Sequence, residues 1–520
     1  MIHGLELASK RIPAPLPMWR APVDAAQWQA AARAVSAAQG RLIALWASQR
    51  SGHDRDGFAV CAAYALADGL VWLHLALPAE SPSYPDISAQ FPSAVRMQRA
   101  AADLLGVTAT GAHDTRPWLD HGAWPADRFP LHTQRPAASA AGEPRSVVDY
   151  DFVRVAGDGV HEIPVGPVHA GVIEPGHFRF SIVGEKVLRL EERLGYTHKG
   201  IENRFTELQP LDAHRLAGRV SGDSTVAYAW AYCMALESAA GIAIAPRARW
   251  LRALLLERER VANHLGDLGA LGNDAALVFG LAQFSRLRED WLRTSRDVFG
   301  HRWTMDCIAP GGTAVDLDAA GAAKIAAQCD ATEREVRELR SIYDEHAGLQ
   351  DRFVGTGQVA PELAAQLGLT GLAGRASGQR ADLRSDHPWP PYDTLAPKMA
   401  IHRAGDVAAR VAVRFAELLE SLRLIRAIVA ALPGGEHRVD VRLGEGPSIG
   451  AGWVEGWRGE IFVALELEGT AQGHRIRRCH CHDPSWQNWP VLEHAVIGNI
   501  VPDFPLINKS FNLSYSGHDL

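Results

Sequence analysis

The spacing of apolar residues predicts long helices in the second half of the chain. Between residues 250 and 268, apolar side chains recur at the three- and four-residue intervals of one helix face: Leu251, Leu254, Leu255, Val261, Leu265 and Leu268. Pro246 lies just upstream, and proline suits the first turn of a helix. Residues 319–346 and 406–432 show similar helical patterns, so we expect two further long helices there.

The first 131 residues mix helical and strand-like periodicity. Residues 58–78 contain two runs of β-forming residues on either side of Asp68-Gly69, a dipeptide that favours a tight hairpin turn. Residues 42–48 are a short apolar run typical of a strand, whereas residues 94–105 have helical spacing. This part of the chain therefore predicts a mixed α/β module.

A stretch rich in proline, alanine, serine and glycine, residues 132–146, has no apolar periodicity and predicts a linker. It divides the chain into two expected domains, residues 1–131 and 147–520. In the second domain, residues 165–190 predict strands joined by glycine-containing turns, and strand-like alternation returns after Val439. We therefore expect an α+β fold, in which the mixed module precedes a mostly α-helical domain with small β-sheets.

Composition narrows the class of protein. The 520 residues are 47% hydrophobic, which allows a large core, and the net charge of −7 gives no basic face for nucleic acid. The six cysteines are scattered, which suits a reducing cytoplasm better than a disulfide framework. We see no secretory signal at the N-terminus. Residues 224–246 are apolar but contain Glu237, so they predict a buried core helix rather than a membrane span.

Two short motifs each admit two interpretations. Cys479 and Cys481 alternate with histidines and could bind a metal, but one strand cannot enclose a tetrahedral site, and buried structural cysteines are the alternative. Residues 355–360 match the G-x-G-x-x-A dinucleotide pattern. That pattern binds a nucleotide only between a strand and a helix, so a simple turn is the alternative here.

Polar residues also gather in otherwise apolar surroundings. A loop rich in glycine and proline, residues 166–177, carries His169, Glu174 and His177. Just before the apolar helix, a second group contains Arg219, Ser221, Asp223 and Ser224. Either Ser221 or Asp223 could cap that helix or belong to a functional site.

The helix predicted from residue 250 carries a third polar group. Glu257, Arg260 and His264 recur at three- and four-residue steps and therefore share one face. A structural ion-pair network and a functional site both explain this spacing.

These residues lie in longer runs that resemble a known family. Residues 166–171, 189–202, 257–266 and 454–460 are similar to motifs of the large subunit of complex-I-like nickel–iron hydrogenases, and of the 49-kDa quinone-site subunit of complex I. This resemblance extends from about residue 150 to the C-terminus. The N-terminal part of the chain resembles the 30-kDa subunit of complex I more faintly, at residues 91–94, 102–106, 120–125 and 129–131. Fusion of the two modules is the arrangement of formate-hydrogenlyase and hydrogenase-4 type enzymes.

The sequence departs from the resembled hydrogenases at the metal. The resemblance implies two Cys-x-x-Cys pairs as nickel–iron ligands, but Ser221 and Ser224 replace the first pair, and Ser485 and Asn488 replace the second. A hydroxyl or amide oxygen is a hard, weak donor that does not suit nickel. Nickel, hydrogenase activity and the metal-triggered C-terminal cleavage of such enzymes are therefore not expected.

Other residues of the implied site are present. Arg458 stands where the hydrogenases have an arginine over the metal, and His169 stands where complex I has the histidine that approaches the quinone head group. The tyrosine that pairs with this histidine in complex I has no counterpart near residues 221–224. The candidate catalytic residues are His169, Arg219, Asp223 and Arg458. The other candidate cavity positions are Ser221, Ser224, Asp483, Ser485, Asn488, Glu202 and His264.

The resemblance implies a redox subunit of a membrane-associated oxidoreductase related to NADH–quinone oxidoreductases. The subunit would lie beside the 4Fe–4S cluster of a small iron–sulfur partner, and antiporter-like membrane subunits would complete the complex. We expect it at the cytoplasmic face of the inner membrane, with a quinone-like acceptor in its polar cavity. The alternative is a structural or coupling subunit without chemistry of its own. Direct nicotinamide chemistry is not expected from this chain.

Overall fold

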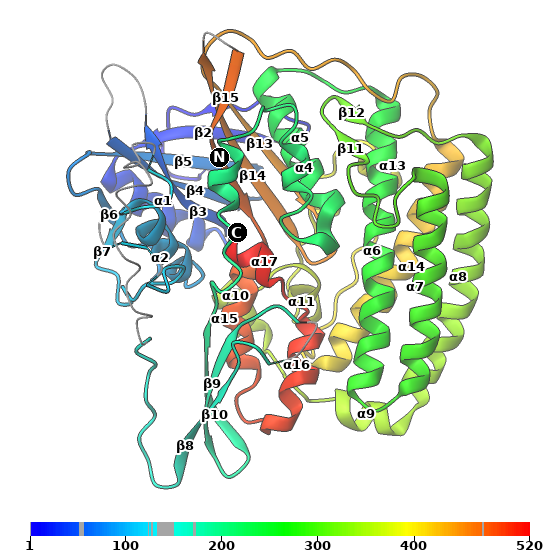
Figure 1. Ribbon diagram of the computed structural model, residues 1–520. Coiled ribbons are helices and arrows are strands. Elements are labelled where there is room, and N and C mark those ends of the chain that lie inside the picture. Colours follow the sequence, from blue (N-terminus) through cyan, green and yellow to red (C-terminus); the bar gives the residue numbers. More distant parts are fainter. Residues whose placement is uncertain are drawn as a thin grey trace.

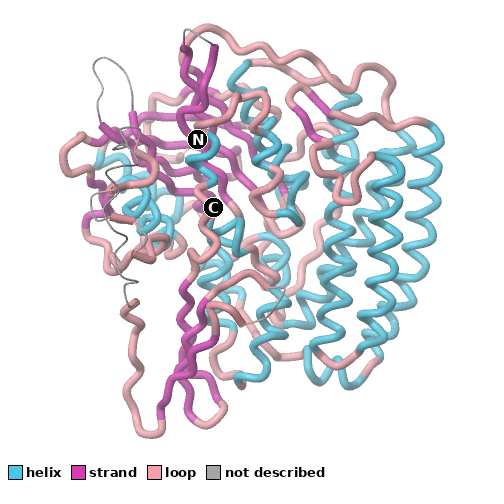
Figure 2. Tube along the Cα trace, in the orientation of Figure 1, coloured by secondary structure: helices cyan, strands magenta, loops and turns pink. Residues whose placement is uncertain are grey.

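The computed structural model describes residues 2–50, 57–122, 124–125, 128–132, 150–169, 173–470 and 473–520. It confirms the α+β fold: a sheet-rich N-terminal module lies on one side, long helices lie on the other, and a small sheet lies between them (Figures 1 and 2). None of the helices in these ranges is both long and apolar enough to cross a membrane. Apart from His132, the predicted linker of residues 132–146 lies outside the described residues.

The N-terminal module is built on a five-stranded sheet with the order β1-β2-β5-β4-β3. The predicted hairpin is confirmed, because β4 and β5 pair antiparallel and Leu66 lies opposite Gly69, whose φ of +136° favours glycine. The elements are β1 (Lys10–Arg11), β2 (Met18–Val23), α1 (Ala25–Ala37), β3 (Arg41–Arg50), β4 (Gly57–Leu66), β5 (Gly69–Leu77), β6 (Ser83–Pro85), α2 (Ala94–Leu105) and β7 (Thr108–Thr110).

The central sheet is antiparallel and consists of β13 (Ser448–Glu455), β14 (Glu460–Thr470) and β15 (Gly473–His482). It meets the N-terminal module where the ring of Trp46 on β3 stacks on His480 of β15, with 4.9 Å between centroids. Helix α5 (Thr225–Ala240) packs against β13, as expected for a buried core helix. The approach is so close that a Cβ atom added to Gly452 would lie 1.8 Å from the Ala231 carbonyl oxygen.

The predicted long helices are confirmed and form the bundle on the right of Figure 1. They are α6 (Pro246–Asp274), α8 (Ala319–Glu345) and α14 (Val407–Ala431), and they are joined by α7 (Val278–Phe299), for which no helix was predicted. Helix α6 packs against both α7 and α14. Its central turns are buried on nearly all sides, so its charged residues lie inside the protein.

The remaining elements connect the module, the central sheet and the bundle. The strands predicted within residues 165–190 are β9 (His177–Val183) and β10 (Lys186–Arg193), and with β8 (Val160–Val165) they form a three-stranded sheet that projects at the bottom of Figure 1. A separate two-stranded sheet consists of β11 (Ile308–Ala309) and β12 (Gly312–Thr313). The shorter helices are α3 (Ile201–Phe205), α4 (His214–Ala217), α9 (Ala347–Phe353), α10 (Pro361–Leu367), α11 (Gly371–Ala376), α12 (Leu383–Asp386), α13 (Tyr392–Leu395), α15 (Ser485–Ala495), α16 (Phe504–Phe511) and α17 (Tyr515–Asp519).

Candidate functional site

Three of the serines singled out by the sequence come together where α5 and α15 begin. The Ser221 hydroxyl donates to Asp223 (Oγ–Oδ1 2.8 Å), and its oxygen lies 2.9 Å from the Ser514 hydroxyl. Ser485 Oγ accepts a hydrogen bond from the Ser514 backbone N–H at 2.9 Å, and Ser224 Oγ lies 3.4 Å from Asp223 Oδ1. We call these five residues, Ser221, Asp223, Ser224, Ser485 and Ser514, the serine cluster.

Arg458 supplies the positive charge beside the serine cluster. Its Nη2 lies 2.6 Å from Asp223 Oδ2, and its Nε donates to the Asn512 carbonyl oxygen at 2.5 Å. Burial raises the pKa of Asp223, but the charge of Arg458 and its hydrogen bonds outweigh that effect, so the pKa lies below its ordinary value. The Asp223 side chain is 35% exposed, whereas that of Arg458 is only 4% exposed. The ion pair therefore presents its carboxylate side to the outside.

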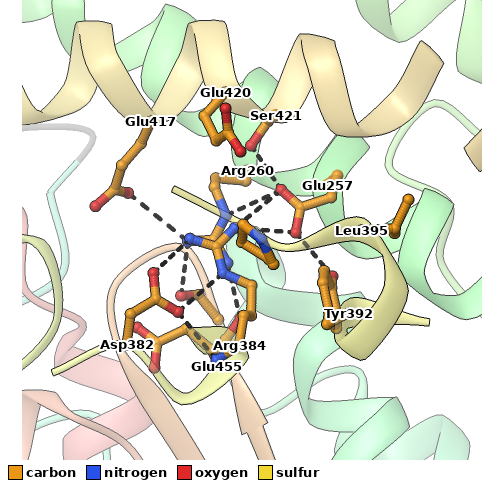
Figure 3. Close-up of polar contacts among 12 residues, drawn as sticks. Glu257, Arg260, Asp382, Arg384, Tyr392, Leu395, Glu417, Glu420, Ser421 and Glu455 are labelled. Carbon is orange, nitrogen blue, oxygen red and sulfur yellow. Dashed lines mark hydrogen bonds and ion pairs between the residues drawn. The ribbon is translucent and has the colours of Figure 1, made fainter. Parts of the chain in front are cut away.

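Glu257 on α6 is fully buried in a network of polar side chains (Figure 3). Its carboxylate accepts hydrogen bonds from Ser421 (2.6 Å), Tyr392 (2.7 Å) and the guanidinium of Arg384 (3.0 Å). Burial raises the pKa of Glu257, but Arg384 and Arg260 outweigh it, so the pKa lies below its ordinary value. The carboxylate is therefore held in its charged form inside the core.

Arg260 connects this network to the strand that leads to Arg458. It lies one turn along α6 from Glu257, and its two terminal nitrogens donate to the carbonyl oxygens of Glu455 (2.8 Å) and Gly456 (3.0 Å). Because Trp457 and Arg458 follow immediately, these bonds fix the backbone that carries the Arg458 guanidinium. The buried network thus positions Arg458 without touching the serine cluster itself.

His264 belongs to the same network, one further turn along α6. Its Nε2 lies 3.0 Å from Glu417, which also binds the guanidinium of Arg375 at 2.8 Å. Burial lowers the pKa of His264 even though Glu417 opposes the shift. Glu257, Arg260 and His264 therefore form the ion-pair network that their spacing suggested.

His169 lies in the loop after β8, next to the segment that completes the serine cluster. Its ring packs edge-on against Phe178 (5.6 Å) and lies 6.4 Å from the ring of Tyr515. Glu174, in the same loop, accepts a hydrogen bond from the Ser516 backbone N–H at 3.1 Å. Residues 514–516 therefore join the His169 loop to the serine cluster.

Comparison with known proteins identifies the family of the chain. The chain matches the family described as respiratory-chain NADH dehydrogenase, 30 Kd subunit, over residues 21–140, and the 49 Kd subunit over residues 274–448. It is 31% identical over 460 residues to formate hydrogenlyase subunit 5 of Escherichia coli (strain K12), which covers 86% of this chain and 79% of that protein. The chain belongs to the family of complex-I-like hydrogenase large subunits.

Two further relatives place this large subunit more closely. The chain is 33% identical over 357 residues to the carbon monoxide-induced hydrogenase of Rhodospirillum rubrum, covering 68% of this chain and 97% of that one. Its fold is similar to a chain in the solved structure of the membrane-bound sulfane sulfur reductase, an archaeal respiratory membrane complex. That match has a TM-score of 0.65 at 23% identity and covers 70% of this chain and 99% of the other. This large subunit is therefore a complex-I-like oxidoreductase subunit.

The residues at the expected thiolate positions of this large subunit do not fit a nickel–iron centre. Ser221, Ser224 and Ser485 offer hydroxyl oxygens that are already engaged with neighbours, and the amide of Asn488 pairs with both backbone groups of Thr370. Hard oxygen and amide donors bind nickel weakly. In the described part of the chain, no group of three or more His, Cys, Asp or Glu side chains is arranged to hold a metal ion.

The structure brings some candidate residues to the serine cluster and holds others elsewhere. Asp483 adjoins the cluster, because its carboxylate accepts from the Ser485 N–H and the Tyr228 hydroxyl, each at 2.8 Å. Arg219 instead forms a two-pronged ion pair with Asp306 (2.7 and 2.8 Å). Glu202 is buried against Arg478 (2.9 Å) and His480 (2.7 Å).

Two residues near the site escaped the sequence interpretation. Glu259 accepts hydrogen bonds from the backbone N–H groups of Val226 (2.6 Å) and Ala227 (3.2 Å), so it caps α5. The interpretation that Ser221 or Asp223 caps this helix is wrong, because neither side chain bonds its first turn. The second residue is Tyr515, which belongs to no motif or spacing pattern that would have marked it as part of a site.

The structure describes both short motifs. Cys479 and Cys481 are buried within β15, where burial raises the pKa of Cys479 well above its ordinary value. Residues 355–360 connect α9 to α10, with Gly355 and Gly357 at positive φ. A helix and not a strand precedes this run, so the turn interpretation is confirmed.

Proposed function

We propose that this large subunit acts without a nickel–iron centre of its own and binds a polar, quinone-like electron acceptor beside the serine cluster. The observation that carries the proposal is the Asp223–Arg458 ion pair, which stays assembled and partly open to the outside although the thiolates are gone. If Arg458 exchanged one of its bonds to Asp223 for a bond to the acceptor, its guanidinium would donate to a carbonyl or an oxyanion, and such bonds strengthen as negative charge develops on reduction.

His169 and Tyr515 supply the other groups that such an acceptor needs. Histidine exchanges a proton near neutral pH, and a tyrosine hydroxyl donates a hydrogen bond to an oxygen of the acceptor. Among the described residues, the Nε2 atom of His169 has no hydrogen-bond partner. The ring separation of 6.4 Å is short enough for both side chains to contact one small head group after local rearrangement.

The electrons would come from a 4Fe–4S cluster in a small iron–sulfur subunit that covers the exposed side of Asp223. The whole complex would lie on the cytoplasmic face of the inner membrane, against antiporter-like membrane subunits. The names of the relatives, a hydrogenlyase subunit and a respiratory membrane complex, support such an assembly. The boundary that we propose between the two modules remains the segment of residues 132–146.

One observation favours a second function, that of a structural or coupling subunit. The serine hydroxyls are bonded to Asp223, to Trp457 and to one another, as in a packed junction. Such a junction could transmit movement between the His169 loop and the central sheet without any redox step.

Elemental analysis tests whether this large subunit lacks a nickel–iron centre. It counts nickel and iron per chain in the complex purified with its native partners. Iron without nickel is expected, and about one nickel per chain would overturn the proposal.

Quinone reduction is then compared in Arg458→Ala, His169→Ala and the exposed control Arg334→Ala. Loss of reduction in the first two alone supports acceptor binding. Full activity in both would favour the coupling function.

A further inference from the structure

We propose that the chain binds a small aromatic anion in a second pocket, between the N-terminal segment and the helices of the large domain. The pocket has a volume of about 480 Å³, which falls in the range of small-molecule sites. It is lined by Arg11 and residues 13–15, by the second half of α5 and the start of α6, and by Trp389-Pro390. None of the five residues of the serine cluster lines this pocket, so it is a different site from the one proposed above for the acceptor.

Flat apolar side chains form the walls of this pocket. Trp230 and Trp389 are buried and pack edge to face, with their ring centroids 5.8 Å apart. Met234, one turn along α5 from Trp230, adds a polarisable side chain, and Pro13 and Pro15 lie across from the helices. Aromatic faces and a thioether favour a planar ring over an aliphatic or strongly hydrated ligand.

The charges around the pocket select an anion. Glu237 and Arg252 neutralise each other through a buried ion pair of 2.6 Å, which is further held by backbone groups. Arg11 and Arg249 also line the pocket, and within the described ranges neither side chain has an ion pair or a hydrogen bond. Two uncompensated guanidinium groups therefore remain for a carboxylate, sulfonate or phosphate on the ligand.

Two polar atoms in the walls are also incompletely bonded. The Ser238 hydroxyl and the Trp389 indole N–H are buried, and within the described residues neither has a hydrogen-bond partner. A buried donor without an acceptor is unfavourable, and in folded proteins it needs an explanation. A hydrogen-bond acceptor on the ligand, reached by either group through a change of rotamer, would offset the free-energy cost of the missing hydrogen bond.

Naphthalene-2-sulfonate is a suitable probe, because it combines a planar ring system with a permanent negative charge. Calorimetry and quenching of tryptophan fluorescence on the full chain should give saturable binding of one equivalent. The neutral naphthalene-2-sulfonamide should bind at least tenfold more weakly, since it lacks the charge that the arginines recognise. Equal binding of the two compounds, or no saturable binding of the sulfonate, would overturn the proposal.

Variants locate the binding site. Arg249→Gln and the exposed Arg11→Gln should each weaken sulfonate binding about tenfold, which corresponds to one charge-assisted hydrogen bond. Met234→Trp should abolish binding by filling the pocket, and Arg334→Gln on α8 should leave binding unchanged. Undiminished binding in both Arg11→Gln and Arg249→Gln would show that the sulfonate binds elsewhere.

Discussion

The hydroxyl oxygens of Ser221 and Ser514 lie 2.9 Å apart and join the start of α5 to the start of α17. Ser514 also caps α17, because its Oγ accepts a hydrogen bond from the Gly517 N–H at 2.9 Å. One side chain thus serves both a helix terminus and the serine cluster.

Replacement of that hydroxyl should reduce stability. Ser514→Ala loses the cap and the contact with Ser221, so we expect the free energy of unfolding to fall by about 1–2 kcal/mol. Urea denaturation of the isolated chain measures this change, with the exposed Ser341→Ala on α8 as the matched control. A loss no larger than that of the control would show that the cluster adds no stability.

The Asp223–Arg458 pair predicts a pH effect. In Arg458→Ala the effects that outweigh burial are lost and only the hydrogen bond from Ser221 still lowers the pKa of Asp223, so this pKa should rise. The acidic limb of the pH profile, measured on the residual quinone reduction of this variant, should therefore move to higher pH, whereas Arg458→Lys, which keeps the charge, should move it less. An unchanged acidic limb in Arg458→Ala would remove Asp223 from the reaction.

The buried network around Glu257 should be important for stability. Glu257→Gln leaves the guanidinium of Arg384, only 2% exposed, without the charge of its second carboxylate partner. Removal of one member of a buried ion pair costs about 3–5 kcal/mol, so a loss of that order is expected in urea denaturation. Glu338→Gln, at an exposed position of α8, should change stability by less than about 0.5 kcal/mol.

Because the pKa of Glu259 is raised in the folded chain, we expect stability to fall as the pH rises. Burial raises its pKa to about 8, from an ordinary value of 4.5. Between these two values the folded chain keeps a proton that the unfolded chain releases, so unfolding becomes easier with increasing pH. The effect across the window is on the order of a few kcal/mol.

Glu259→Gln tests this assignment, because its amide cannot titrate. Denaturation measured between about pH 5 and pH 8 should show a shallower decline for the variant than for the parent chain. Some decline remains, because burial also raises the pKa of Glu455, to about 7. Parallel curves for variant and parent would mean that Glu259 is already ionised at neutral pH.

The contact between α5 and β13 tolerates no side chain at Gly452. A Cβ atom there would overlap the Ala231 carbonyl, so Gly452→Ala must push the helix away from the sheet. We expect a loss of about 1–3 kcal/mol or more, measured by thermal and chemical unfolding. Gly434→Ala is the control, because its added Cβ meets no atom within 4 Å.

The parts of the fold that could be predicted are those determined by local sequence. The Asp68-Gly69 hairpin and the long helices depend on turn residues and on the spacing of apolar side chains. The boundaries of α2, Ala94–Leu105, agree with the segment that showed helical spacing. Helix α6 extends beyond the predicted segment at both ends: it begins at Pro246, which suits a first turn, and it continues past Leu268 through the buried Leu271 to Asp274.

The candidate site could be predicted only in part. The resemblance to the hydrogenases identified Ser221, Ser224 and Ser485, and the structure brings all three into one cluster. Ser514 and Tyr515 could not be found in this way, because their contacts arise from tertiary packing between distant segments. Arg219 is the opposite case, a residue that the sequence proposed but that the structure does not bring to the cluster. Its guanidinium forms an ion pair with Asp306 instead.

Arg260 has a consequence for the frame around the serine cluster. Its guanidinium anchors the carbonyl oxygens of Glu455 and Gly456, so a helix and not a metal ligand holds the segment that leads to Arg458. A change of the donors at residues 221, 224, 485 and 488 would therefore leave this frame in place. The fold itself sets no obstacle to replacing the chemistry that it carries.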